Sequence, residues 1–462
     1  MHPSVIVIGG GLSGLAAAIR LARFNENVLL LEKHTRIGGL NSYYYRNNRL
    51  FETGLHAITN YAEKDVKRAP LNRLLRQLKI KRDEIGFRQQ IKSEICFPGQ
   101  ASLVFSNDFQ EMHDDICSTF KQESQGFSDL VSHLDSVDPF TQSPYLSTRT
   151  VLSNYLKSPL LTDMLLCPML YYGSSWENDL DFKQFTILFR SIYQEGFFRP
   201  EGSIKVFLDL LVSRYKEFGG SLRLNTGVKR ILSRSGKING VVLESGEQLN
   251  SRYVVSTIGL DETRNLLGEK KDRGGSRRLG FCESIFQLKD TSRTLLPPDR
   301  TCIFFNEGSS FRYEIPETPV DFSSGVISLP FNFKGETSSD GFVEVRTTNL
   351  ANYQLWHTAA FDPPAYKTLK KECAAQSCSH AEAIIGRFSD HIVYQDSFTP
   401  VTIERFTGKH EGAIYGSPEK VQDGNIGYDN LVLAGTDQGF LGIVGSMLSG
   451  VSVVNQHILP RI

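Results

Sequence analysis

The sequence has no excess of charge of either sign. Its 462 residues include 51 basic and 51 acidic side chains, so the formal net charge is zero. No overall positive charge is available to attract nucleic acid, and we predict no nucleic-acid partner. One run, residues 269–278, is basic in part, but its glycines and mixed charges favour an exposed loop over a phosphate or lipid patch. The hydrophobic fraction of 40% and the charged fraction of 22% exclude disordered, fibrous and coiled-coil proteins.

Cysteine is sparse, and no two cysteines form a C-x-x-C pair. The seven cysteines are scattered, and an odd number of dispersed thiols suits a reducing compartment, where they act as small buried apolar residues. We therefore expect a cytoplasmic location. The nearest grouping, Cys373, Cys378 and His380, does not have the ligand spacing of a standard zinc site, so we predict no metal.

The sequence also lacks an apolar run with the character of a signal peptide or a membrane span. Residues 5–19 are apolar, but no basic segment precedes them and three adjacent glycines interrupt them. The uncharged residues 438–456 approach the ~20 residues that a span needs. That segment contains four glycines and three serines in a strand-turn-helix context, so we expect a helix at a binding site. We predict no transmembrane helix.

Residues 5–32 combine a strand, a glycine turn, a helix and a second strand that ends in an acid. Residues 5–8 are wholly apolar, as in a strand buried on both faces of a parallel sheet. Residues 9–14 form a G-x-G-x-x-G turn, and small and apolar residues follow at helical spacing. A second apolar strand, residues 28–31, leads to Glu32. This complete context is strong evidence for a dinucleotide site in a Rossmann-type fold.

Each glycine of the turn has a distinct physical role. Gly9 permits the tight turn, Gly11 lets the backbone approach a pyrophosphate, and Gly14 lets the helix and the strand pack closely. The amides at the start of the helix, at Leu12 and Ser13, are expected to point at the anion with the helix dipole behind them.

The segment after the second strand separates FAD from NAD. Glu32 should accept hydrogen bonds from the adenosine ribose and would repel a 2′-phosphate. From Glu32 and Lys33 to Gly38 and Gly39 the spacing is E-x5-G-G, which resembles amine oxidases, phytoene desaturases and their relatives. The resemblance implies FAD, with both glycines against the diphosphate and ribityl chain and Lys33 nearby. Most such enzymes continue with arginine, whereas Leu40 follows here, which leaves that contact open.

Residues 51–56 resemble the F-D-x-G-x-H stretch of retinol saturases and prolycopene isomerases. Glu52 replaces the usual aspartate, and Gly54 is expected beside the cofactor. His56 is a candidate catalytic residue, because a histidine near a flavin can serve as a hydrogen bonder or a proton donor. A satisfied packing role for His56 is the alternative, and the sequence leaves both open.

The middle of the chain contains a helix followed by strands. Residues 203–218 have an apolar face at helical spacing, with Ser203 placed to cap the start. Strand-like runs follow at residues 227–234, 238–244 and 252–257. The resemblance implies that a β-meander lies over the nucleotide domain here and that Val228 contacts the adenine through its backbone.

The end of the chain contains a third marker. An apolar strand leads to Gly435, Thr436 and Asp437, and spaced glycines open a helix. This resembles the closing flavin motif of the family. It implies that Asp437 binds a ribityl hydroxyl and that amides around Ile443 and Val444 face the pyrimidine end of the ring, where a helix dipole can stabilise the anionic reduced flavin.

These markers predict an α/β fold of two domains. A Rossmann-type FAD-binding domain with a β-meander is expected from three segments, and an inserted substrate domain of antiparallel sheet and helices from two, with a helical apolar part near residues 110–195. The FAD-binding segments are 1–90, 196–275 and 396–462, and the substrate segments are 91–195 and 276–395. No second G-x-G-x-x-G follows a strand, so electrons must pass through the substrate, a quinone, oxygen or another partner.

The resemblance implies hydride transfer between flavin N5 and a carbon of a long apolar substrate, with a desaturase or isomerase preferred. A polyene or isoprenoid is the favoured substrate class, and an acyl lipid is its rival. The aromatic helical part is compatible with core packing, with an apolar tunnel or with peripheral membrane contact, and oligomerisation is open. The competing functions are an amine or porphyrinogen oxidase and a flavin-free lipid escort that resembles the GDP-dissociation inhibitors.

Overall fold

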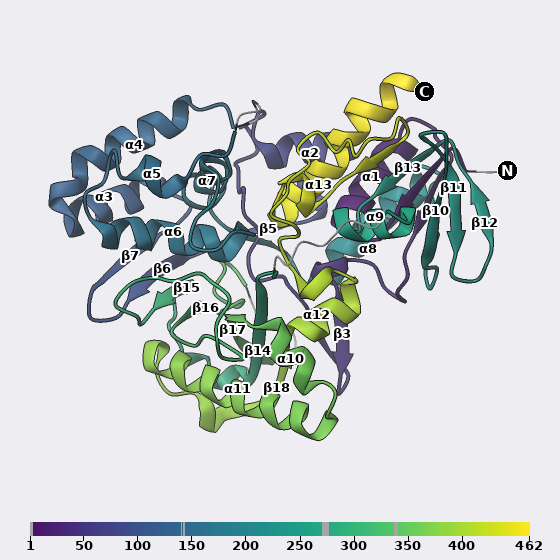
Figure 1. Cartoon of the computed structure of the whole chain (residues 1–462). Helices are drawn as coiled ribbons and strands as arrows, with labels where there is room; N and C mark the ends of the chain where they lie inside the picture. The colour runs from purple at the N-terminus through teal and green to yellow at the C-terminus, as the bar shows by residue number, and fades with distance from the viewer. Residues whose placement is uncertain (1–2, 140, 142–143, 270–276, 337–340) are drawn as a thin grey trace.

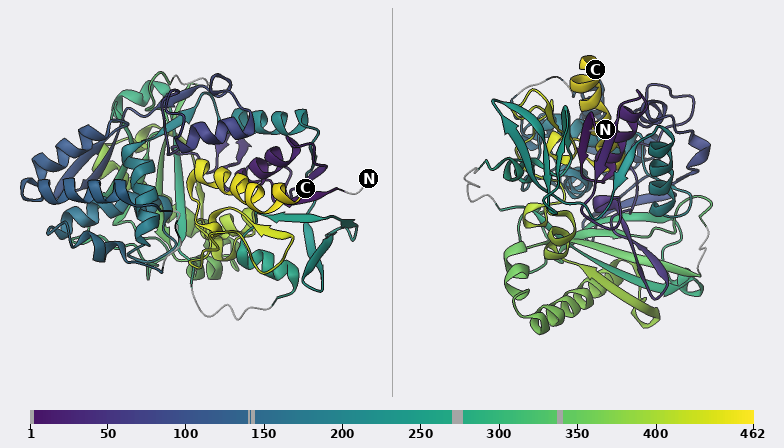
Figure 2. Two further views of the ribbon diagram at one scale, coloured as in Figure 1. Left: turned by 90° about the horizontal axis from the view of Figure 1, so that it is seen from above. Right: turned by 90° about the vertical axis from the view of Figure 1, so that its right-hand side faces the viewer.

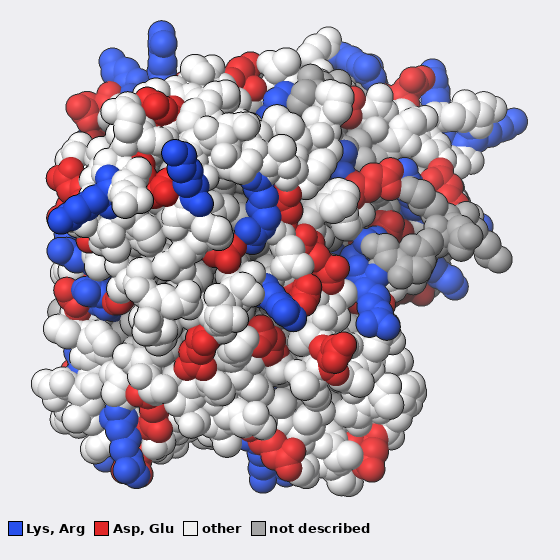
Figure 3. Space-filling model, turned by 60° about the vertical axis from the view of Figure 1, so that its left-hand side comes forward, with Lys and Arg blue, Asp and Glu red and all other residues white. Residues whose placement is uncertain are grey.

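The computed structural model describes residues 3–139, 141, 144–269, 277–336 and 341–462 (Figure 1). The basic run at residues 269–278 lies mostly outside these residues. Among the described residues, no helix has both the length and the apolar character needed to cross a membrane. The face drawn in Figure 3 mixes basic and acidic side chains over a largely uncharged surface, as the zero net charge leads one to expect.

The first layer of the fold is a five-stranded parallel sheet. Its order is β19-β13-β1-β2-β9, so strands from the beginning, middle and end of the chain lie side by side. Four of these strands are buried along their whole length, because they consist almost entirely of aliphatic residues. The strands are β1 (Val5–Ile8), β2 (Val28–Leu31), β9 (Ser221–Arg223), β13 (Tyr253–Ser256) and β19 (Leu431–Leu433).

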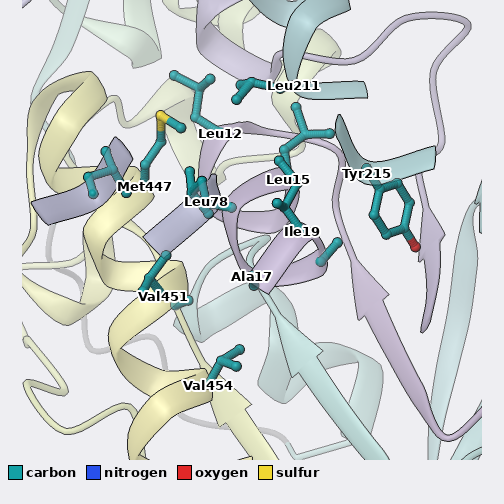
Figure 4. Close-up of a cluster of buried hydrophobic side chains, with 14 of the residues drawn as sticks. Leu12, Leu15, Ala17, Ile19, Leu78, Leu211, Tyr215, Met447, Val451 and Val454 are labelled. Carbon is teal, nitrogen blue, oxygen red and sulfur yellow. The ribbon is translucent and has the colours of Figure 1, made fainter. Parts of the chain in front are cut away.

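Helices from both ends of the chain cover one face of this sheet. Helix α1 (Leu12–Ala22) packs against α13 (Gly442–Val453), α8 (Ile204–Glu217) and α2 (Pro70–Leu78). In Figure 4, Leu15 and Ile19 of α1 lie among Met447, Val451 and Tyr215 in this core. The amino-terminal and carboxyl-terminal segments therefore share one hydrophobic core.

A three-stranded antiparallel meander covers the opposite face. It consists of β10 (Val228–Arg234), β11 (Lys237–Leu243) and β12 (Gln248–Asn250). Side chains alternate along β1, so Val5 and Val7 face the helices while Ile6 and Ile8 face the meander. Two of the three predicted strand runs are β10 and β11, whereas the third is β13 of the parallel sheet. The meander is completed by β12, which is too short and too polar to be recognised from its sequence.

A second sheet, of seven strands, lies in the other half of the molecule. Its order is β18-β14-β17-β16-β15-β6-β7, and every pairing is antiparallel except β15 with β6. The strands are β6 (Lys92–Phe97), β7 (Ala101–Phe105), β14 (Gly280–Lys289), β15 (Arg300–Asn306), β16 (Ser324–Ser328), β17 (Phe342–Ala351) and β18 (Ile392–Phe398). The result is an α/β fold of two regions, as predicted.

Helices cover both faces of this second sheet. Helix α11 (Pro363–Ile385) packs on one face through Ala374, Cys378 and Ala381. A helical group packs on the other face and forms an aromatic core with it, at the left of Figure 1 and of the left view in Figure 2. Its helices are α3 (Phe109–Thr119), α4 (Ser124–Ser136), α5 (Thr148–Leu152), α6 (Pro159–Gly173) and α7 (Phe182–Phe189). The residue boundaries given above for the two domains stay a prediction.

Short elements connect the two regions. A hairpin of β3 (Tyr43–Arg46) and β4 (Arg49–Glu52) follows the second glycine loop, and β5 (Phe87–Gln89) pairs with β8 (Phe198–Pro200). Helix α9 (Leu260–Leu267) follows β13, and α10 (Tyr353–Ala359) precedes α11. Helix α12 (Pro400–Thr407) leads back to the parallel sheet.

The start of α8 corrects one expectation from the sequence. Ser203 occupies the N-cap position, but its side chain makes no capping hydrogen bond. Instead, Glu52 Oε1 accepts from the backbone N–H of Ile204 at 2.6 Å, and Glu52 Oε2 accepts from Arg199 Nη2 at 2.6 Å. The longer side chain of Glu52, in place of an aspartate, reaches the helix terminus and the buried guanidinium at once. The glutamate therefore helps hold α8 on the hairpin.

Candidate functional site

One large cavity lies where the two regions meet. Its volume is about 1290 Å³, more than the roughly 300–1,000 Å³ typical of a single small-molecule pocket. It begins at the carboxyl ends of β1, β2, β13 and β19, which is where parallel α/β sheets bind ligands, and it continues over β14, β16 and β17. Residues from both ends of the chain line it, among them Gly11, Glu32, Gly435 and Ile443.

The first glycine turn leaves its backbone open to the cavity. Gly9 has φ +102°, a conformation that favours glycine. A Cβ at Gly14 would lie 1.9 Å from the carbonyl oxygen of Gly9, so Gly14 permits close packing and does not itself line the cavity. A Cβ at Gly11 would meet only Gly39 Cα, at 4.0 Å, so the space in front of Gly11 is free for a ligand. Leu12 and Ser13 also line this end.

The second glycine loop lies directly beside the first one, because the N–H of Gly38 donates to the carbonyl oxygen of Gly10 at 2.8 Å. Gly38 has φ +113° and Gly39 has φ +59°, and a Cβ at Gly39 would point toward Gly11 Cα at 3.4 Å. Gly38, Gly39, Leu40 and Gly54 all line the cavity, and a Cβ at Gly54 would lie 2.6 Å from the carbonyl oxygen of Leu40. These glycines bring two loops to one narrow passage, as a diphosphate site needs.

The acid at the end of β2 is held at the cavity wall by backbone amides. Glu32 Oε2 accepts from the N–H of Gly10 at 2.6 Å, and Oε1 accepts from the N–H of His34 at 2.9 Å. A carboxylate oxygen can accept more than one hydrogen bond, so both oxygens keep capacity for ribose hydroxyls. Lys33 and Val228 line the same end of the cavity. His34 does so too, with a buried Nε2 that has no partner among the described residues, and sequence reasoning missed it.

Asp437 does not face the cavity, which corrects the expectation of a ribityl contact. Its carboxylate is 2% exposed and accepts from the N–H groups of Leu260 and Ser417, each at 2.6 Å. Burial alone raises the pKa of Asp437, but the ammonium groups of Lys409 and Lys420 outweigh burial and hold this pKa below its ordinary value. Asp437 is therefore an ionised structural residue that joins α9 to the loop before β19.

Thr436 takes the place at the cavity that Asp437 was expected to occupy. Thr436 and Gly435 line the cavity, and Thr436 Oγ1 is buried without a hydrogen-bond partner among the described residues. One extra residue between the glycine and the acid turns the acid away from the cavity and the hydroxyl toward it. The threonine hydroxyl can exchange hydrogen bonds with a ligand hydroxyl, because it both donates and accepts.

The glycine-spaced helix α13 closes this side of the cavity. Gly442, Ile443 and Ser446 line the cavity at the helix start, whereas Val444 points into the core and is 1% exposed. The prediction for Val444 concerns its backbone amide at the helix start and stays a prediction, while its side chain belongs to the packing with α1. A Cβ at Gly450 would lie 2.1 Å from the carbonyl oxygen of Ser13, so this glycine allows α13 to contact α1 closely.

The far part of the cavity has an aromatic wall. Tyr171, Tyr172 and Tyr415 line it with Phe281 and Leu188. The hydroxyl of Tyr415 donates to the carbonyl oxygen of Tyr171, and burial raises the pKa of all three tyrosines, so they stay neutral. The wall therefore presents uncharged rings, which suits an apolar chain.

His56 lies between the two parts of the cavity. Its Nε2 is 3.2 Å from Glu283 Oε2, and its Nδ1 is buried without a partner among the described residues. Both His56 and Glu283 line the cavity. Glu283 could not be selected from the sequence, because it is 227 residues away on β14 and belongs to no motif.

These features fit an FAD molecule. The dinucleotide would be held by the open backbone at Gly11 and Gly39, by the Glu32 carboxylate and by the Thr436 hydroxyl, and the unpartnered polar atoms of His34 and Thr436 are placed at the cavity for a ligand. No group of three or more His, Cys, Asp or Glu side chains within the described residues is arranged to hold a metal ion. The fold and the cavity define an FAD-dependent oxidoreductase.

Comparison with known proteins places the chain in a family. It belongs to the flavin-containing amine oxidoreductase family, whose profile matches residues 12–274, more than half of the chain. It is similar to the chloroplastic prolycopene isomerase of Arabidopsis thaliana, with 22% identity over 91% of this chain and 76% of that protein. It is also similar to human all-trans-retinol 13,14-reductase, with 23% identity over 99% of this chain and 85% of that protein.

The solved structures agree with the fold. An oxidoreductase from Methanosarcina mazei superposes with a TM-score of 0.68 over 98% of this chain and 99% of that chain, at 16% sequence identity. At this identity the likeness establishes the shared architecture and says nothing of the substrate.

Proposed function

We propose that this FAD-dependent oxidoreductase acts on C–C or C=C bonds of a long apolar substrate, a polyene or isoprenoid, as a desaturase or isomerase. The observation that carries the proposal is the continuity of one cavity from the dinucleotide end into a part walled by neutral aromatic rings. A cavity of this size has room for a second ligand beside the cofactor. The names of the two relatives, an isomerase of prolycopene and a reductase of retinol, support a polyene substrate.

Bound FAD would supply the acceptor or donor of a hydride. The residues proposed to hold it are the cavity-lining members of the predicted set, together with two that the structure adds. They are Gly9, Gly11, Leu12, Ser13, Glu32, Lys33, Gly38, Gly39, Leu40, Gly54, Val228, Gly435 and Ile443, with His34 and Thr436 added. The aromatic wall of Tyr171, Tyr172 and Phe281 would align the apolar chain and exclude water from it.

One observation favours a second candidate, an amine-type flavin oxidase. Glu283 places a carboxylate at the cavity, and a carboxylate can bind an ammonium group. This carboxylate is already paired with Arg346, at 3.2 Å, and bonded to His56, so little of its charge is left for a substrate. A flavin-free lipid escort is the weakest alternative, because Glu32 and the paired glycine loops are retained.

Anaerobic flavin reduction separates these candidates. The FAD-loaded protein, mixed without oxygen with prolycopene or all-trans-retinol, should lose its oxidised flavin absorbance or, after reduction by dithionite, should convert the polyene to a saturated product or to another geometric isomer. Putrescine and benzylamine serve as the amine arm. Turnover with either amine and none with the polyenes would contradict the proposal, and a protein without flavin absorbance after incubation with FAD would favour the escort.

We further propose that the protein contacts membranes peripherally through the rim of the cavity. Tyr45, Phe361 and Phe406 are exposed by 46%, 79% and 55%, and the first and last of them line the cavity. Ala360 and Pro363, on either side of Phe361 in the sequence, line it as well. The Arg405 guanidinium lies 5.5 Å from the Phe406 ring. Aromatic rings with adjacent cations suit the interface of an anionic bilayer, from which an apolar substrate could enter.

Vesicle flotation tests this surface. The wild-type protein should float with vesicles of phosphatidylcholine and phosphatidylglycerol, and the triple change Tyr45→Ser, Phe361→Ser and Phe406→Ser should abolish flotation. Trp176→Ser is the matched control, since Trp176 is 45% exposed and does not line the cavity. Recovery of the wild type entirely in the vesicle-free fraction would contradict the proposal.

A further inference from the structure

A chain of buried charges ends at the wall of the cavity. His56 Nε2 lies 3.2 Å from Glu283 Oε2, and Glu283 Oε1 lies 3.2 Å from Arg346 Nη1. Arg346 Nε donates to Glu344 Oε2 at 2.9 Å, and the Arg346 side chain is 1% exposed. Buried ion pairs contribute little stability compared with apolar residues of the same size. The arrangement therefore calls for an explanation other than stability.

The positions of these four charged side chains relative to the cavity supply that explanation. His56 and Glu283 line the cavity, whereas Arg346 and Glu344 lie behind them in the sheet. Burial alone lowers the pKa of Arg346, but Glu344 and Glu283 outweigh burial and raise this pKa above its ordinary value, so the guanidinium stays charged and pairs with Glu283. The Glu283 carboxylate, 3.2 Å from His56 Nε2, is placed to accept a hydrogen bond from a ring N–H and so to fix the imidazole ring. From the cavity inward, the order is therefore a base (His56), a carboxylate that orients it (Glu283) and a cation that pairs with the carboxylate (Arg346).

The other groups around His56 are neutral or paired. Arg199 Nη1 donates to the backbone oxygen of His56 at 3.3 Å, and its charge is matched by Glu52 at 2.6 Å. Burial keeps the Tyr172 hydroxyl neutral by raising its pKa. Among the described residues, the charged groups linked to His56 through these contacts are Glu283 on β14, Arg199 on β8, Glu52 on β4, and Arg346 and Glu344 on β17, with Tyr172 on α6 close to Glu283. Of these, Glu283 is the one hydrogen-bonded to the ring.

We propose that His56 and Glu283 form the acid–base pair of this cavity, with His56 as the catalytic residue and Glu283 as its positioning residue. The inference rests on the proposed function. Conversion of a CH–CH unit to C=C removes a hydride and a proton, and FAD, when bound, would accept the hydride with both of its electrons. The neutral imidazole of His56 takes that proton from the neighbouring carbon, and Glu283 stabilises the positive charge that forms. In the saturating direction the imidazolium returns the proton. A single turnover needs no other oxidant or reductant.

The first test does not depend on the substrate. Two-bond ¹H–¹⁵N correlation spectra of protein labelled with [¹⁵N]histidine report the tautomer of each ring, and the signal lost in His56→Gln identifies residue 56. The wild type should show the Nε2–H tautomer for His56, and Glu283→Gln should replace it by a mixture of tautomers. Glu307→Gln is the matched control, because Glu307 pairs with His380 at 2.7 Å on the surface. A His56 signal that Glu283→Gln leaves unchanged would overturn the positioning role.

The second test measures the proton step. With prolycopene or all-trans-retinol as the probe, His56→Gln should slow single-turnover flavin reduction, or its reverse, about 100-fold, as the loss of a general acid–base residue typically does. FAD content and melting temperature should not change. Glu283→Gln should slow the step and alter its pH profile, and Glu283→Asp should restore part of the rate. An unchanged rate in His56→Gln would overturn the catalytic role. A wild type inert toward both polyenes would overturn the proposed function and the proton step, while the tautomer still decides whether Glu283 positions His56.

Discussion

Two glycines of the first turn should respond to substitution in opposite ways. Gly11 has φ −72° and ψ 178°, which any residue can adopt, and a Cβ there meets no atom nearer than 4.0 Å. Gly11→Val should therefore leave the fold intact while its side chain fills the space in front of the turn. At Gly14 a Cβ would lie 1.9 Å from the carbonyl oxygen of Gly9, so even Gly14→Ala must displace α1 from β1.

The magnitudes follow from these contacts. A hydrogen bond to a charged group contributes about 1.5–3 kcal/mol, so the loss of one amide–phosphate bond weakens binding by about 10- to 150-fold. Gly11→Val should raise the FAD dissociation constant at least about 100-fold without changing the melting temperature of the apoprotein. Gly14→Ala should lower the free energy of unfolding by about 1–3 kcal/mol or more, as an overpacked core does.

Fluorescence titration of the apoprotein with FAD and thermal unfolding followed by circular dichroism measure the two effects separately. Binding of FAD to Gly11→Val as tightly as to the wild type would show that Gly11 does not face the ligand. Unfolding of Gly11→Val while Gly14→Ala stays folded would contradict the geometry equally, because that geometry assigns the ligand to Gly11 and the packing to Gly14.

Three further predictions concern neighbouring residues. Thr436→Val should weaken FAD binding about 10-fold with little change in stability, since it removes one hydroxyl at the cavity. Equilibrium titration with FAD measures this affinity, and an unchanged dissociation constant would contradict the prediction. Asp437→Asn should destabilise the fold instead. Because the folded-state pKa of Asp437 is lowered, the stability it contributes is complete above its ordinary value of 3.8 and is lost as the pH falls below it, so denaturant unfolding of wild type and variant should converge in acid. Glu52→Gln should lower the free energy of unfolding by about 3–5 kcal/mol, because it leaves the buried Arg199 guanidinium without an opposite charge. The shorter side chain of Glu52→Asp should not reach both Arg199 and the N–H of Ile204. Urea unfolding curves that coincide with those of the wild type would contradict this prediction.

The sequence was sufficient for features that depend on local backbone chemistry. The glycine turn at residues 9–14 and the acid at Glu32 could be recognised because their spacing follows from the close approach of backbone to ligand. The paired loop at Gly38 and Gly39 could be recognised for the same reason. The convergence of both chain ends on one cavity followed from the two nucleotide motifs together.

Features that depend on rotation by one residue or on distant partners could not be predicted. One inserted residue exchanges the roles of Thr436 and Asp437, and nothing in the local pattern tells which of the two faces inward. The cap of α8 comes from Glu52, about 150 residues earlier. A serine at the N-cap position, Ser203, favoured a local cap, so the sequence did not indicate this distant one. Glu283 and Arg346 are ordinary positions in β14 and β17, and only the strand pairing brings them to His56.

An experimental structure of the protein reconstituted with FAD would show directly whether both ends of the chain bind one dinucleotide. We expect density for the whole dinucleotide in the cavity, with contacts to Gly11 and Glu32 from the beginning of the chain and to Thr436 and the start of α13 from its end. A well-ordered structure in which FAD occupies another place, or in which these two segments do not touch it, would show that the two chain ends do not form the flavin site.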